Sequence, residues 1–164
     1  MKISGENISN GINYLFDYED IDSFEFMKDK KCTQTYAVCF YEGKMVVVYN
    51  GKKNTWGLVG GTIEEGETFE ETLIREIKEE SNMEVLKFSP IGYQKVTDTR
   101  NGDQFYQLRY VCTVKPYGEF ISDPAGTITK IALINPADHK EYFDWLEIGD
   151  RIIQRAQELL PNLL

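Results

Sequence analysis

The sequence has few of the residues on which several classes of functional site depend. It contains one histidine, His139, which excludes metal centres built from several imidazoles, including the usual zinc sites. Its three cysteines show no CxxC spacing, and Cys39 and Cys112 each lie inside an apolar run, where a buried thiol fits. We therefore expect a reducing, cytoplasmic location, and we expect any bound metal ion to have oxygen ligands.

Long apolar runs and an excess of basic residues are also missing. Apolar runs such as Met45–Tyr49 are far shorter than the ~18 residues that a membrane span needs, and the N-terminus lacks the basic and apolar stretches of a targeting segment. Acidic residues outnumber basic ones by 27 to 18, which gives a formal net charge of −9. We therefore expect no membrane association, and the acidic surface argues against binding to duplex nucleic acid.

The remaining composition is that of a globular domain. Of the 164 residues, 41% are hydrophobic and 27% are charged, and no repeat or linker divides them, so we expect one domain over residues 1–164. Within it, residues 1–31 are expected to form an N-terminal hairpin or an irregular arm, and residues 142–160 a helix or a pair of helices.

The middle of the chain carries clearer patterns. β-branched and aromatic runs predict strands at Thr35–Tyr41, Met45–Tyr49, Trp56–Val59, Val85–Val96, Phe105–Val114 and Ile128–Ile134. A helical period spans Thr68–Asn82. Together these elements predict an α+β fold in which helices sandwich a mixed β-sheet, an α/β/α arrangement.

The negative charge is concentrated in one segment. Residues 61–84 contain nine of the 27 acids and only two bases, Arg75 and Lys78, for a local charge of −7. The other 140 residues therefore share only −2. The acidity of the chain is thus a property of one loop and the helix that follows it.

Three glutamates of the predicted helix share one face. Glu76, Glu79 and Glu80 stand at i, i+3 and i+4, and Glu76 and Glu80 lie beside the apolar stripe that contains Leu73 and Ile77. Carboxylates crowded at the edge of a core are costly unless they are paired or bound to a cation. A hard divalent cation is the expected partner.

The segment before the helix adds to this prediction. Gly60 and Gly61 are expected to follow a strand and to let the backbone turn, so that a carbonyl there serves as a further oxygen ligand. Glu67, near the start of the helix, is expected to pair with Arg75 two turns later and to hold the loop against the helix.

The spacing of these residues resembles the Nudix box. The matching segment runs from Gly61 to Met83, and the box positions are filled by Gly61, Glu67, Arg75, Glu76, Ile77, Glu79, Glu80 and Met83. Asn82 stands where the family has glycine, at the residue expected to end the helix in the left-handed conformation. Asparagine is the next-best residue for that conformation, so the departure affects the scaffold more than the chemistry.

The resemblance implies a hydrolase that uses Mg²⁺ or Mn²⁺ to cleave the diphosphate linkage of a nucleoside diphosphate joined to another group. It implies that Glu76, Glu79 and Glu80 are catalytic and hold the metal together with Gly60, while Gly61, Glu67 and Arg75 support the site. Many relatives use a further acid from a later loop, and Asp123 and Glu119 are the candidates here. Relatives are often dimers, so the resemblance also allows a homodimer.

The substrate is less constrained. Thr97–Arg100 lacks the proline or tyrosine that marks the ADP-ribose and dinucleoside polyphosphate branches, which favours a nucleoside triphosphate or a related nucleotide. Candidate phosphate contacts are Arg100, Arg109 and Lys95, and candidate base-stacking rings are Tyr36, Phe40 and Tyr106. Asp123 is a further candidate substrate-binding residue. For Arg109, an exposed salt bridge is an equal alternative. The alternative function is a Nudix-fold module that binds a nucleotide without hydrolysing it.

Overall fold

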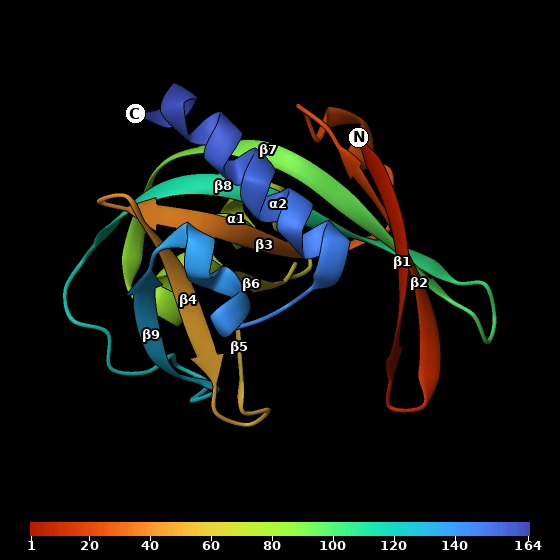
Figure 1. Cartoon of the computed structure of the whole chain (residues 1–164), viewed down its shortest axis with the longest axis horizontal. Coiled ribbons are helices and arrows are strands. Elements are labelled where there is room, and N and C mark those ends of the chain that lie inside the picture. The colour runs from red at the N-terminus through yellow and green to blue at the C-terminus, as the bar shows by residue number, and fades with distance from the viewer.

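The computed structural model describes all 164 residues (Figure 1). The strands are β1 (Lys2–Ser9), β2 (Ile12–Asp20), β3 (Cys32–Tyr41), β4 (Lys44–Asn50), β5 (Thr55–Gly57), β6 (Val59–Thr62), β7 (Met83–Asp98), β8 (Gln104–Pro116) and β9 (Ile128–Ile134). The helices are α1 (Phe69–Ser81) and α2 (Leu146–Leu159), with short 3-10 helices η1 (Glu25–Met27), η2 (Pro136–Glu141) and η3 (Leu160–Leu163). None of these helices is long and apolar enough to cross a membrane.

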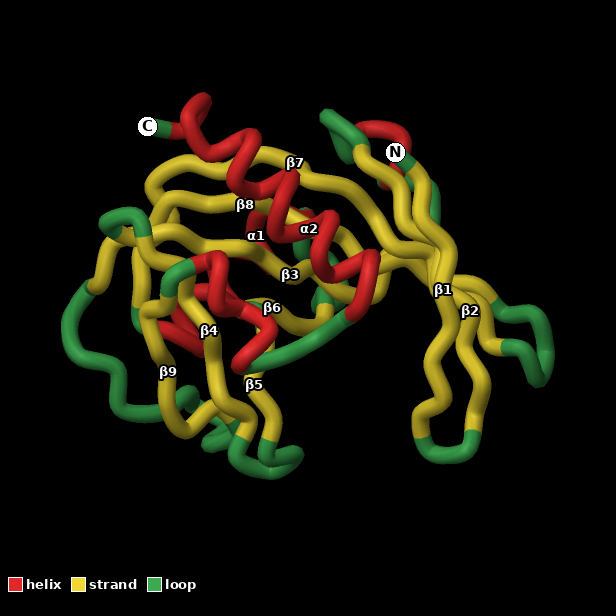
Figure 2. Tube along the Cα trace, viewed as in Figure 1, coloured by secondary structure: helices red, strands yellow, loops and turns green.

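All nine strands belong to one mixed sheet, drawn in yellow in Figure 2. Its order is β1-β2-β7-β8-β3-β4-β5, with β6 paired to β3 and β9 paired to β4. Every neighbouring pair is antiparallel except β3 and β8, which run parallel. Because β3 pairs with β4 only through Phe40 and Tyr41, its earlier residues pair with β6. The strand that leads toward α1 is thereby fixed against the centre of the sheet.

A hydrophobic core lies on each face of the sheet. Leu73 and Ile77 of α1 are buried against one face, and Ile152 and Ile153 of α2 are buried against the other. Figure 1 shows α2 crossing the near face, with α1 behind the sheet. The predicted mixed sheet between helices is therefore confirmed.

The local sequence sets both ends of α1. The side chain of Thr68 caps the start of the helix, since its Oγ1 accepts the Glu71 amide hydrogen bond at 3.1 Å. Asn82 ends the helix in the left-handed conformation, at φ 54° and ψ 45°, as predicted. Its backbone amide donates to the Lys78 carbonyl at 2.9 Å, which satisfies one of the last free carbonyls of the helix.

Some predicted boundaries were wrong. The strand expected at Trp56–Val59 is divided between β5 and β6, and the glycine pair lies inside β6, because Gly60 and Gly61 pair with Tyr36 and Thr35 of β3. The C-terminal helix begins at Leu146, later than expected. Of the two alternatives for residues 1–31, the structure contains the hairpin, formed by β1 and β2 and followed by η1.

Candidate active site

The glycine pair brings β6 against the acidic face of α1. A side chain at Gly61 would place its Cβ 2.5 Å from Oε1 of Glu76, closer than any real contact. A Cβ at Gly60 would meet the Thr35 carbonyl and the Tyr36 ring, which pack directly on the glycine. The Gly60 amide donates to Oε1 of Glu80 at 2.9 Å. Both glycines are therefore required by close approach.

Arg75 is the centre of a dense polar cluster. Its Nε and Nη2 donate to the two carboxylate oxygens of Glu67 at 2.7 and 2.9 Å, a bidentate pair. Nη2 also donates to the Thr62 carbonyl at 3.0 Å, so the arginine fastens the loop after β6 to the helix. Nη1 reaches Glu76 at 2.9 Å and Glu79 at 3.3 Å. The predicted contact between Glu67 and Arg75 is thus present in the structure.

The environment shifts the pKa values of the acids in this cluster in opposite directions. The hydrogen bonds from Arg75 lower the pKa of Glu67 to about 2. Burial raises the pKa of Glu76 above its ordinary value, against the effect of Arg75. Burial also raises the pKa of Glu80 to about 8, with smaller contributions from the charges of Glu76 and Asp123. Glu80 has no cationic partner, since its one hydrogen bond comes from an amide.

Asp123 lies in the irregular segment between β8 and β9. It is 8% exposed, and its Oδ1 has no hydrogen-bond partner. Its charge acts on Glu80, so the loop brings this acid toward the helix. Glu119 uses its backbone instead, as its carbonyl accepts a hydrogen bond from the Asn82 side chain at 3.2 Å. Of the two acids expected from this loop, Asp123 acts on Glu80, and Glu119 lines a second, smaller pocket together with Glu79.

A cavity of about 1000 Å³ opens beside Glu80. Glu80, Gly60, Tyr36 and Arg109 line it where β3, β6 and β8 meet α1. The other walls are formed by residues 4–7 of β1, residues 53–58 around β5, and the segment 142–148 before and at the start of α2. The cavity thus lies between elements from both ends of the chain.

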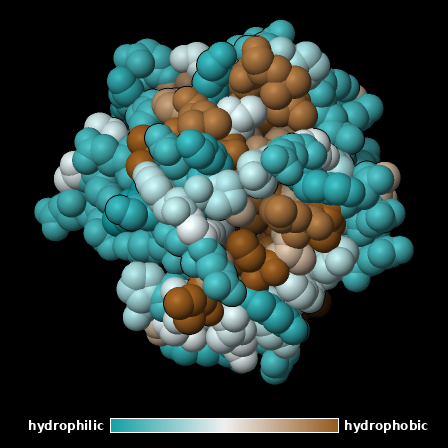
Figure 3. Space-filling view, turned by 90° about the vertical axis from the view of Figure 1, so that its left-hand side faces the viewer, coloured by the Kyte–Doolittle hydropathy of each residue, from teal (hydrophilic) through white to brown (hydrophobic).

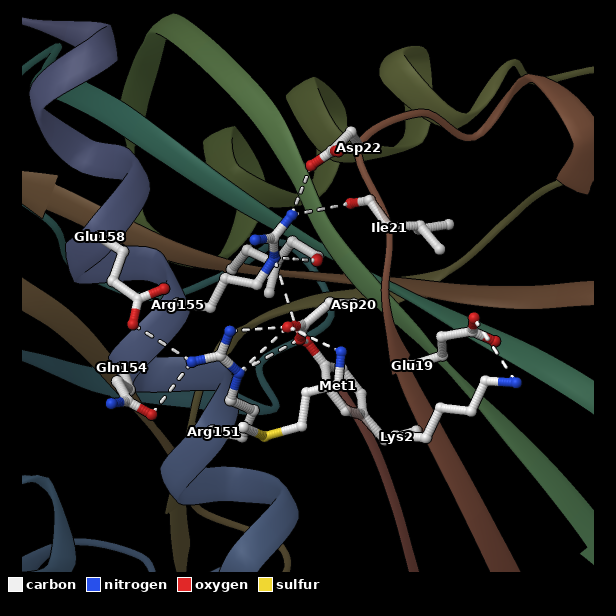
Figure 4. Close-up of polar contacts among 12 residues, drawn as sticks. Met1, Lys2, Glu19, Asp20, Ile21, Asp22, Arg151, Gln154, Arg155 and Glu158 are labelled. Atoms are coloured by element: carbon white, nitrogen blue, oxygen red, sulfur yellow. Dashed lines mark hydrogen bonds and ion pairs between the residues drawn. The ribbon is translucent and has the colours of Figure 1, made fainter.

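Ion pairs fasten the N-terminal hairpin to α2, and so fix two walls of the cavity (Figure 4). Arg151 of α2 donates through Nη2 to Oδ2 of Asp20 at 2.6 Å, and each of these side chains is only 11% exposed. Arg155 donates to Asp22 at 2.6 Å and to the Ile91 carbonyl at 2.7 Å. Although burial opposes it, hydrogen bonds from Arg151 and Tyr18 hold the pKa of Asp20 below its ordinary value.

The remaining predicted contacts separate into two groups. Arg109 and Tyr36 line the cavity, and Arg109 is 5% exposed and forms no ion pair, so the alternative of an exposed salt bridge was wrong. The others lie elsewhere. Arg100 pairs with Asp98 in the turn after β7, Lys95 pairs with Asp17, Phe40 is buried in the core, and Tyr106 contacts Tyr93.

Two aromatic residues of the cavity were not predicted as substrate contacts. Trp56 and Trp145 both line it, and Trp56 packs edge-on against Tyr142 with ring centroids 5.3 Å apart. A tryptophan in a short strand or before a helix is usually a core residue, and no spacing in the sequence sets these two apart. Only the folding of the segment 142–148 toward β5 brings them to one cavity.

The residues near α1 fit a hard divalent cation. Glu76, Glu79 and Glu80 supply only oxygen donors, and Glu80 lines the cavity with no positive charge to balance it. Across the 164 residues, no three acidic, histidine or cysteine side chains already converge at the spacing of a metal site. Glu76 and Glu79 instead accept hydrogen bonds from Arg75. The donor set is present, with two of its members held by the arginine.

Comparison with solved structures gives the same fold. The pyrophosphohydrolase BsRppH of Bacillus subtilis, solved as a mutant, matches over 94% of this chain and 96% of its own, with a TM-score of 0.69 and 15% identity. A NUDIX hydrolase from Nitrosomonas europaea matches over 78% of this chain and 90% of its own, at TM-score 0.64 and 18% identity. The NUDIX domain of Shewanella oneidensis NrtR, solved with ADP ribose, covers 83% and 92%, at TM-score 0.62 and 18% identity.

Sequence comparison leads to the family itself. No curated protein matches this chain. The NUDIX domain family matches residues 33–156, which include β6, α1 and every acid of the cluster around Arg75. With the box spacing, the fold and this match in agreement, the chain belongs to the NUDIX family.

Proposed function

We propose that this chain hydrolyses the diphosphate linkage of a nucleoside diphosphate derivative, with Mg²⁺ or Mn²⁺ held by Glu76, Glu79, Glu80 and the Gly60 carbonyl. The observation that carries the proposal is Glu80, a half-buried carboxylate that lines a large cavity and has no cationic partner. When bound, a divalent ion neutralises charge that develops on phosphate oxygens and activates the attacking water.

The chain's own residues have separate tasks in this proposal. Arg75 holds Glu67 and the loop after β6 in place, so that the backbone of Gly60 stays against Glu80. The absence of a side chain at Gly61 leaves room for the carboxylate of Glu76. One of the glutamates accepts the proton of the attacking water, and Asp123 is available as a further acid from the loop before β9.

A nucleotide suits the shape and lining of the cavity. Its volume of about 1000 Å³ is at the upper end of the range for small-molecule sites. Trp56 and Trp145 line the same cavity as Glu80 and offer aromatic surface on which a base can stack. Among the similar structures, the NrtR domain was solved with ADP ribose. We favour a nucleoside triphosphate or a related nucleotide as the substrate.

Two further parts of the proposal concern location and assembly. The cytoplasmic location is a prediction from the three cysteines, which are all free in the structure. The homodimer is also only a prediction. On the face shown in Figure 3, apolar side chains form separate patches among hydrophilic ones, which offers no broad apolar surface for a second copy.

The test is a substrate panel with matched variants. Nucleoside triphosphates, nucleotide sugars, ADP-ribose and dinucleoside polyphosphates are incubated with Mg²⁺ or Mn²⁺, and the released products are measured. Glu79→Gln and Glu80→Gln should lower turnover of the best substrate by about 100-fold or more while the protein stays folded. Equal rates for parent and variants would refute the metal-site assignment. Binding without turnover on every member would support the nucleotide-binding module instead.

A further inference from the structure

Arg109 of β8 is a buried cation without an acidic partner. Its Nη2 donates to Oε1 of Gln107 at 3.1 Å and its Nη1 to the Leu108 carbonyl at 3.4 Å, while its Nε has no partner. A guanidinium has about five N–H donors, so most of them are unused here. Burial lowers the pKa of Arg109 to about 10, which still leaves it charged at neutral pH. Such a group is costly to bury unless something binds it.

A short series of contacts joins Arg109 to the acidic side of the cavity. Its guanidinium carbon lies 5.0 Å from the centre of the Tyr36 ring, a cation–π arrangement. The Tyr36 ring packs on Gly60, and the Gly60 amide binds Glu80. Arg109, Tyr36, Gly60 and Glu80 all line the same cavity. The unpaired cation is therefore next to the proposed cleavage site, and one aromatic ring keeps it from the unpaired acid.

The partner that this environment lacks is an anion. Gln107 and the Leu108 carbonyl are neutral acceptors. The ionisable side chains that act electrostatically on Arg109 are two tyrosines, Tyr36 and Tyr18. A nucleobase would offer acceptors but no negative charge. A phosphate offers both, because its oxygens match the fork of the guanidinium and its charge balances the buried one.

We propose that Arg109 binds a phosphate group of the substrate beside the diphosphate linkage that is cleaved. This inference rests on the proposed function, because it assumes that the linkage lies at Glu76, Glu79 and Glu80. It also names the substrate class. A third phosphate engages Arg109, so the site selects nucleoside triphosphates and other chains of three phosphates over compounds with only a diphosphate.

Anion binding is tested first, without metal and without turnover. Inorganic tripolyphosphate is titrated into the chelator-treated protein and followed by calorimetry. Arg109→Gln should weaken its binding by about 10- to 100-fold, since charge-assisted hydrogen bonds are lost. Lys115→Gln is the matched control, because Lys115 is an exposed residue of the same strand and its loss changes the net charge equally. Equal binding by parent and Arg109→Gln would overturn the inference, whatever the protein hydrolyses.

Kinetics then test the selection. Arg109→Gln should lower kcat/KM about 10- to 100-fold on the preferred nucleoside triphosphate and much less on ADP-ribose, with Arg109→Lys between parent and Gln. Equal losses on both substrates would overturn the selectivity. A loss confined to one base, with tripolyphosphate binding intact, would show that the guanidinium binds the base and would also overturn it. No turnover by the parent would refute the proposed function, while the metal-free titration would still decide the role of Arg109.

Stability separates this role from a purely structural one. If Arg109 existed to support the fold, Arg109→Gln would lower the melting temperature. Because the native arginine is a buried charge without an acid, we expect the variant to melt at or above the parent's temperature when phosphate is absent. Added tripolyphosphate should raise the melting temperature of the parent and leave that of Arg109→Gln unchanged. A clear loss of stability on substitution would support the structural role and contradict the proposal.

Discussion

Glu80 should make the metal-free protein less stable as the pH rises. Its pKa in the folded protein is about 8, against an ordinary value of 4.5, mainly because it is buried. The folded carboxyl therefore keeps its proton between these values while the unfolded one loses it. A raised pKa contributes stability that is present below the unfolded value and is lost as the pH rises toward the folded value. The free energy of unfolding should then fall over this window.

The size of the effect follows from the same shift. Each pH unit within the window costs up to about 1.4 kcal/mol, so the change from about pH 5 to pH 8 is up to about 4 kcal/mol. Glu80→Gln cannot ionise, and its side-chain oxygen can still accept the hydrogen bond from the Gly60 amide. The variant should lack this part of the pH dependence and be more stable than the parent at about pH 8.

Urea unfolding followed by tryptophan fluorescence provides the measurement. Parent, Glu80→Gln and the control Glu84→Gln, an exposed acid of β7, are unfolded with a chelator present at several pH values. Added Mg²⁺ should stabilise the parent at high pH and have little effect on Glu80→Gln, because binding to the folded state alone raises its stability. If the parent and Glu80→Gln show the same pH dependence, the burial argument for Glu80 is refuted.

Three other substitutions test the supporting residues. Gly61→Ala should leave the protein folded but reduce turnover, since the new Cβ displaces the Glu76 carboxylate. Circular dichroism checks the fold and a rate assay checks turnover, and unchanged activity would contradict the prediction. Glu67→Gln should cost about 1–3 kcal/mol in urea unfolding at neutral pH, because Arg75 loses its bidentate partner, and the difference from the parent should shrink as the pH falls from 4.5 toward 2. Asn82→Ala should cost about 1–2 kcal/mol through its left-handed backbone, and an unchanged melting temperature would refute that.

Sequence periodicity was sufficient for the parts of this site that depend on neighbours along one helix. The spacing of Glu76 and Glu80, the pairing of Glu67 with Arg75 and the left-handed Asn82 all follow from the geometry of α1 and its two ends. These relations are local, so they do not depend on how the rest of the chain folds. The family match over residues 33–156 includes all of these residues.

The cavity could not be predicted in this way, because its lining comes from distant segments. Arg109 occupies an ordinary polar position of an alternating strand, and only the fold places it in a cavity that residues of β1, β2 and α2 also line. Trp56 and Trp145 line one cavity only because the segment before α2 returns to β5. Arg100 does not line the cavity for the converse reason, since it lies in the turn between β7 and β8, outside the cavity walls.

The cavity contains one acid and one base that do not neutralise each other. Glu80 has no cationic partner and Arg109 has no anionic partner. The ring of Tyr36 lies between them, because it packs on Gly60 and also contacts the Arg109 guanidinium. If folding stability alone had shaped this region, a direct ion pair or two apolar residues would cost less. A divalent cation with a phosphate chain offers a positive charge to Glu80 and a negative charge to Arg109 at once. The proposed metal–nucleotide site thus accounts for the unpaired Glu80 and the unpaired Arg109 together.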